Sequence, residues 1–159
     1  MKKIKKNLII FVLLIILPQC GFKVLDKSKI NNFSIKEIQS EGDDRINFKI
    51  KNNLRINEKE NSKNILNLTL STQKNKSIKE KNIKNEITKY EIVINTTIKF
   101  SLSMSNGKIY SSSLSSQGDF LVANNYATTL DNEKKLIDNL TDDLSEKIID
   151  KILSEINDI

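Results

Sequence analysis

The sequence predicts an α+β fold: a two-layer sandwich in which two helices cover one face of a four-stranded mixed sheet. Apolar or β-branched side chains occupy every second position from Tyr90 to Met104, which is typical of a long strand with one buried face. Residues 44–56 and 128–157 instead space their apolar side chains three or four positions apart, as helices with one buried side do. With two further short strands, the predicted element order is β-α-β-β-β-α.

A β-hairpin is predicted directly after the long strand. Asn106-Gly107 is the strongest short signal for a two-residue turn, because both residues tolerate positive φ. The return strand runs from Ile109 to about Gln117 and is rich in serine around Leu114. The sequence therefore predicts that these two strands pair antiparallel.

The register of this hairpin follows from the length of its turn. A two-residue turn would place Met104 opposite Ile109 and Phe100 opposite Ser113, so that large side chains lie beside small ones on the covered face. A bulge would shift the pairing by one residue and would turn Leu114 inward instead. We expect the first of these two registers.

The remaining elements come from shorter patterns. A first strand is predicted over Asn31–Gln39 and a second over Ile65–Ser71, where leucines alternate with polar residues. Between them a helix is predicted from Asp44 to Ile56, capped by Asp43 or Asp44. Its apolar face consists of Ile46, Ile50 and Leu54, and the stripe of the final helix, about Thr128–Asn157, consists of Leu136, Ile137, Leu140, Leu144, Ile148, Ile152 and Ile156.

Residues 73–89 have no apolar period and are dominated by lysine. Such a segment is usually a solvated loop or an extension of a strand beyond the core. A binding role is the alternative, because lysines can act as point charges toward the phosphates of an anionic glycolipid.

The first nineteen residues are predicted to be a secretory signal peptide. Four lysines precede the apolar run Leu8–Leu17. This run is too short to cross a bilayer, because a membrane-spanning helix needs about twenty apolar residues. Cys20, the only cysteine of the chain, directly follows this segment. We expect Cys20 to be lipidated and to anchor a single domain over residues 20–159. Pro18 and Gln19 are unusual before such a cysteine, and an ordinary leader beside a free thiol is the alternative.

Composition argues against several classes of function. The chain has 26 basic and 20 acidic residues, and without the four lysines of the leader the net charge falls from +6 to +2, which gives little support to nucleic-acid binding. A single cysteine forms no internal disulfide, and the absence of histidine removes imidazole metal sites and histidine-dependent nucleophiles. Asp43-Asp44 and Asp142-Asp143 are expected to be caps or solvated faces. We therefore expect no enzyme activity, no catalytic or metal-binding residue and no cofactor.

Several segments, taken in order, resemble the LptE family of lipopolysaccharide-assembly lipoproteins. These segments are Cys20-Gly21-Phe22, Arg45 with Asn52-Asn53-Leu54, Thr88–Ile92, the Asn-Gly turn with its serine-rich return strand, Phe120 with Tyr126-Ala127-Thr128, and the charged closing helix. They span nearly all of residues 20–159. The chain departs from the family at Pro18-Gln19 and in its scarcity of arginine.

The resemblance implies the same sandwich fold and a function in binding. It implies an outer-membrane lipoprotein on the periplasmic face that plugs the β-barrel which inserts lipopolysaccharide into the outer leaflet, with that barrel, lipopolysaccharide and the membrane as partners. A different outer-membrane assembly machine, such as the one that inserts barrels, is the alternative. The lysines expected to contact lipopolysaccharide are Lys81, Lys84, Lys89, Lys99 and Lys108.

Overall fold

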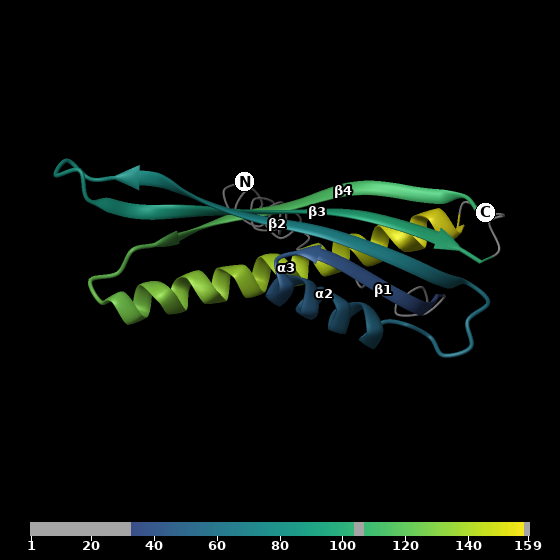
Figure 1. Cartoon of the computed structure of the whole chain (residues 1–159). Helices are drawn as coiled ribbons and strands as arrows, with labels where there is room; N and C mark the ends of the chain where they lie inside the picture. The colour runs from purple at the N-terminus through teal and green to yellow at the C-terminus, as the bar shows by residue number, and fades with distance from the viewer. Residues whose placement is uncertain (1–32, 104–106, 158–159) are drawn as a thin grey trace, which may run out of the picture.

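The computed structural model describes residues 33–103 and 107–157. Along the chain the elements are β1 (Ser34–Gly42), α2 (Asp44–Ile56), β2 (Ile65–Lys81), β3 (Ile87–Leu102), β4 (Ile109–Leu121) and α3 (Tyr126–Asn157). The strands form one sheet in the order β1-β2-β3-β4, and both helices lie on the same face of it (Figure 1). The predicted α+β sandwich and its β-α-β-β-β-α order are confirmed.

The sheet is mixed, as predicted. β1 pairs parallel with β2, and β2, β3 and β4 form an antiparallel meander. β1 begins later than predicted, at Ser34, and continues to Gly42. Its pairing register shifts between Ile35 and Glu37, because an extra residue is needed for Ile35 and Ile38, three positions apart, to face the same side.

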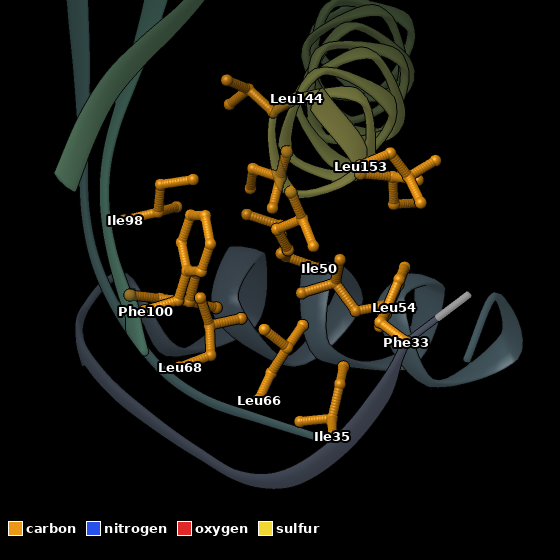
Figure 2. Packing of buried hydrophobic residues seen from close by; sticks show 14 of the residues in the cluster. Phe33, Ile35, Ile50, Leu54, Leu66, Leu68, Ile98, Phe100, Leu144 and Leu153 are labelled. Atoms are coloured by element: carbon orange, nitrogen blue, oxygen red, sulfur yellow. The ribbon is translucent and has the colours of Figure 1, made fainter. Parts of the chain in front are cut away.

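The core lies between the sheet and the two helices (Figure 2). α2 has the predicted bounds, and Ile46, Ile50 and Leu54 are all at most 1% exposed. α3 contributes the predicted stripe, in which Leu140 and Leu144 are buried and Leu136 is partly buried. α3 is two residues longer at its start than predicted and runs along the meander, short of the projecting β2–β3 tip (Figure 1).

The two helices are also joined by polar contacts. Lys49 of α2 donates to the Asp142 carboxylate at 3.0 Å and to the Asp138 carbonyl at 2.9 Å. Asn53, one turn further along α2, donates to Asp142 at 3.0 Å and to Ser145 at 3.1 Å. These contacts fix α2 beside the middle of α3.

The predicted hairpin of β3 and β4 is present, but its predicted register is wrong. Phe100 pairs with Tyr110 rather than with Ser113, and the last pair is Ser101 with Ile109. The connection is therefore longer than two residues. Met104 and Asn106 lie outside the described residues.

Two aromatic pairs account for this register. The rings of Phe100 and Tyr110 stack with centroids 5.2 Å apart, and those of Tyr90 and Phe120 stack at 5.5 Å. Both pairs are directly opposite in the ladder, where side-chain contact contributes most to strand pairing. Even-numbered residues of β4 consequently face the helices, and Leu114 lies inward and partly buried, as the alternative predicted. The pairing is nevertheless shifted from the expected register by three residues, not by the one residue of that alternative.

Candidate functional site

The hairpin of β2 and β3 extends past the rest of the sheet. β1 ends at Gly42, opposite Thr72, whereas β2 continues to Lys81 and stays paired with β3 as far as Ile87. The part of the lysine-rich segment that precedes the turn is thus a strand extension rather than a loop. Figure 1 shows this hairpin projecting at the same end as the start of α3. We call this region the hairpin end: residues 76–91 with 119–133.

Asn82 organises the turn at the tip of the projecting hairpin. Its side-chain Oδ1 accepts hydrogen bonds from the backbone N–H groups of Lys84 at 2.9 Å and Glu86 at 3.0 Å. Asn85 takes a positive φ of 64°, which asparagine tolerates better than most residues. The tip therefore has a defined backbone that holds Ile83 and Lys84 out in solvent.

On the covered face of the hairpin end, Lys76 lies over an aromatic pair. Its Nζ is 4.4 Å from the ring centroid of Tyr90 and 5.1 Å from that of Phe120, distances at which a cation is attracted to the ring face. The same ammonium donates to Glu133 of α3 at 2.6 Å. Lys76 thus joins the strand extension to the first part of α3.

On the open face of the sheet, most nearby charges already neutralise each other. Lys79 contacts Asp119 at 2.6 Å and Glu91 at 3.2 Å, and Lys89 contacts Glu80 at 3.0 Å. The hydrogen bond to Asp119 raises the pKa of Lys79, and the hydrogen bond from Lys89 lowers the pKa of Glu80. These three ion pairs leave little charge for a ligand.

Exposed apolar side chains concentrate at this end. Ten large apolar residues among the described ones are exposed, and six of them belong to the hairpin end. Ile83 is fully exposed at the tip. The other five are Ile78, Leu121, Val122, Tyr126 and Leu130. Such a concentration is typical of surfaces that bind a protein or a lipid.

The structure brings together some of the lysines predicted to bind lipopolysaccharide and separates others. Lys81 and Lys84 are exposed at the hairpin tip, and neither has an ion pair with an acidic side chain among the described residues. Lys89 lies nearby but is paired with Glu80. Lys99 lies on the open face, about 33 Å further along β3 at about 3.3 Å per residue.

Lys108 belongs to the same distant half as Lys99. Its Nζ lies 4.5 Å from the ring centroid of Tyr110, at the other end of the meander. The five lysines therefore form no single cluster. The exposed apolar residues of the hairpin end are not part of the predicted site, because their exposure depends on the tertiary fold and leaves no signal in the local sequence.

Asp43 is a helix cap, as predicted, whereas Asp142 and Asp143, expected on a solvated face or as caps, form ion pairs with Lys49 and Lys147. Asp43 caps α2 by accepting from the Ile46 N–H at 3.1 Å and contacts Lys74 at 3.1 Å. Partial burial works against ionisation, but these two contacts outweigh it and lower the pKa of Asp43. Asp143 is likewise partly buried, and Lys147 and Ser116 lower its pKa. Among residues 33–103 and 107–157, no three acidic or cysteine side chains are grouped as a metal site would require.

Concave sites are small. A hollow of about 230 Å³ on the open face is bordered by Lys99, and one of about 240 Å³ lies between α2 and α3 beside Lys49 and Ile137. Both are below the roughly 300–1,000 Å³ of typical small-molecule sites. In the described part of the chain, no helix is long and apolar enough to cross a membrane.

The fold is shared with bacterial lipoproteins. Rare lipoprotein B of Shewanella oneidensis matches with a TM-score of 0.59 and 13% identity, over 76% of this chain and 97% of that one. A lipoprotein of Caulobacter crescentus matches with a TM-score of 0.53 and 7% identity, over 82% and 94%. Lipoprotein B of Nitrosomonas europaea matches with a TM-score of 0.53 and 9% identity, over 86% and 93%.

At these identities the likeness establishes the fold. No protein-family model matches the chain, and no curated protein matches it.

Proposed function

We propose that this chain is a lipid-anchored protein of the outer membrane that binds lipopolysaccharide and assists the β-barrel which inserts it into the outer leaflet. The hairpin end is the observation that carries this proposal, because it combines exposed lysines that have no acidic partner in the described part of the chain with exposed apolar side chains. Its fold, shared with bacterial lipoproteins, and the ordered resemblance to the LptE family support the same function.

The two parts of the hairpin end match the two parts of an anionic glycolipid. Lys81 and Lys84 would contact phosphates as point charges at the tip. Ile83 and the exposed side chains at the start of α3 would cover acyl chains, each buried CH₂ contributing about 0.8 kcal/mol. Binding of this kind needs neither a deep pocket nor a chemical step.

The test is a matched pair of charge reversals on the purified chain. Lys81→Glu with Lys84→Glu changes the hairpin tip, and Lys59→Glu with Lys63→Glu makes the same charge change on exposed residues outside the hairpin end. At low salt we expect the first pair to weaken lipopolysaccharide binding by about fivefold or more, since charge-assisted hydrogen bonds are among the stronger contacts. We expect the control pair to bind as wild type.

Salt separates this mechanism from purely apolar binding. The Debye length falls from about 10 Å at 0.1 M to about 3 Å at 1 M, so the advantage of wild type over the tip variant should shrink over that range. Equal binding of both double variants at low salt would remove the hairpin tip as the lipid site. Copurification with the lipopolysaccharide-inserting barrel, rather than with another barrel assembly machine, tests the partner separately.

The proposed anchor, Cys20, lies outside the described residues. We expect a mature chain that begins at Cys20 and carries acyl chains, whose combined burial holds the protein at the membrane. Intact-mass analysis of the protein extracted from membranes measures both features. An unmodified Cys20, or a mature chain starting elsewhere, would contradict this part of the proposal.

A further inference from the structure

Within residues 33–103 and 107–157, β4 forms an edge of the sheet and has β3 as its only neighbouring strand. In an antiparallel ladder, alternate residues direct their N–H and C=O groups toward the neighbour and away from it. The Val122 N–H donates to the Thr88 carbonyl at 3.0 Å, so even-numbered residues of β4 bond to β3. The odd-numbered residues of β4 therefore direct their backbone groups toward the free edge.

Two side chains of α3 confirm this direction. Lys147 donates to the Ser115 carbonyl at 3.0 Å, and Asn132 donates to the Leu121 carbonyl at 3.2 Å. Both acceptors are odd-numbered.

The free edge of β4 also lacks the usual protection against strand pairing. Natural edge strands carry charged residues or proline, which keep other strands from adding to them. Residues 109–118 contain neither. The other free edge, where β2 continues past Thr72, carries lysine at positions 74, 76, 79 and 81. Lysines thus protect the free edge of β2 against strand pairing, whereas residues 109–118 of β4 have no such protection.

We propose that the free edge of β4 pairs with the same edge of a second copy of this chain, antiparallel and centred on Ser113. This register places Ser113 opposite Ser113 of the second copy, Ser111 opposite Ser115, and Ile109 opposite Gln117. It aligns the whole uncharged stretch with itself, so no like charges meet across the pairing. A copy of this chain fits better than a charged partner strand for the same reason.

Side chains on both faces suit this pairing. On the open face, the centre would consist of serine hydroxyls, which both donate and accept; Ser113 already exchanges a hydrogen bond with Thr97 at 3.0 Å. On the covered face, the partly buried Leu114 lies next to the centre and would meet its counterpart diagonally. The pairing therefore joins two sheets and extends both cores.

Lys147 limits the pairing. In the proposed register, the Ser115 carbonyl accepts from the N–H of Ser111 in the second copy. The Lys147 side chain, which lies at this carbonyl on the free edge, has to move aside to make room for that strand. Lys147 keeps a partner when it does so, because its Nζ is also 2.7 Å from Asp143. Removing the lysine side chain should then strengthen the pairing.

Disulfide trapping tests the register in the full chain with Cys20→Ser, so that an introduced cysteine is the only thiol. In an antiparallel ladder, two residues that are directly opposite and hydrogen-bonded to each other have Cα atoms about 5.5 Å apart. This separation lies within the range of about 4.4–6.8 Å that a disulfide spans. We expect Ser113→Cys to form dimers under mild oxidation. Ser71→Cys, exposed on the open face of β2, is the control and should stay monomeric.

Mixed samples distinguish this register from random collision. Ser111→Cys and Ser115→Cys proteins should cross-link to each other and not to themselves. Adding Lys147→Ala to Ser113→Cys should increase dimer formation about three- to tenfold, the value of one hydrogen bond. Adding Ser111→Pro, which removes an N–H on the free edge, should reduce it.

Two results would overturn the inference. One is a Ser113→Cys dimer that forms no faster than the Ser71→Cys dimer. The other is an unchanged dimer yield in the Lys147→Ala variant. The inference rests on the edge geometry of β4 and does not depend on lipopolysaccharide binding at the hairpin end.

Discussion

Gly42, the last residue of β1, lies so close to Thr72 of β2 that a Cβ on Gly42 would be 1.9 Å from the Thr72 carbonyl oxygen. Gly42 also has a φ of +95°. The next residue, Asp43, donates its N–H to the same carbonyl at 3.1 Å and caps α2. This approach of two backbones is where β1 ends and the chain turns into the helix layer.

Gly42→Ala should therefore be strongly destabilising. Gly107 is a matched control, because it too has a positive φ but a Cβ there would meet nothing within 4 Å. We expect Gly107→Ala to cost about 1–2 kcal/mol of unfolding free energy for the left-handed conformation alone. Gly42→Ala should cost more, by urea denaturation. Equal losses would mean that the clash is relieved by movement of β1.

Leu144 is fully buried in the middle of α3, and Leu140 is 7% exposed. Either residue changed to alanine should lower the free energy of unfolding by about 2–5 kcal/mol, the usual cost of a cavity at a buried leucine. Leu130, on the same helix but 46% exposed, is the control and should lose much less. A loss below about 0.5 kcal/mol at Leu144 in urea melts is incompatible with the packing.

Thr72 and Thr96 face each other across β2 and β3, both 1% exposed, with their hydroxyl oxygens 3.1 Å apart. Thr96→Val should cost about 1–3 kcal/mol, because it leaves the Thr72 hydroxyl buried without that partner. Changing both to valine removes both polar groups and should recover most of this loss. A double variant as unstable as the sum of the single ones would show that each hydroxyl has another role.

Asp43 gives the stability a dependence on pH. Its pKa is lowered in the folded protein by the Ile46 N–H and Lys74, which outweigh the opposing effect of burial. A carboxyl with a lowered pKa stabilises the fold above its unfolded pKa, about 3.8, and this contribution is lost as pH falls through the lower folded value. Asp43→Asn keeps a capping oxygen but loses the charge.

Wild type should therefore be more stable than Asp43→Asn near pH 7, and the difference should shrink below about pH 4. Thermal melts of both proteins between pH 7 and pH 2 measure it. A constant difference over that range would assign the role of Asp43 to its hydrogen bonds alone.

Elements whose signals are local could be predicted from the amino-acid sequence. α2 starts and ends where the cap at Asp43 and the spacing of Ile46, Ile50 and Leu54 predict, because a helix satisfies its own backbone within one turn. The same holds for most of α3 and for the alternation along β3. From these patterns alone the fold class and strand order could be derived.

The register of β4 and the ion pairing of the lysines depend instead on contacts between distant parts of the chain. The Asn-Gly signal predicted a two-residue turn, but the stacking of Tyr110 on Phe100 and of Phe120 on Tyr90 fixes a different alignment. These contacts join residues that are distant in sequence, so no local pattern contains them. Likewise, the ion pair between Lys89 and Glu80 forms only when β2 and β3 pair, and the same pairing leaves Lys81 without an acidic partner in the described part of the chain. Which charges remain for a ligand is a property of the folded surface, since the ion pairs of Lys79 and Lys89 each join two strands.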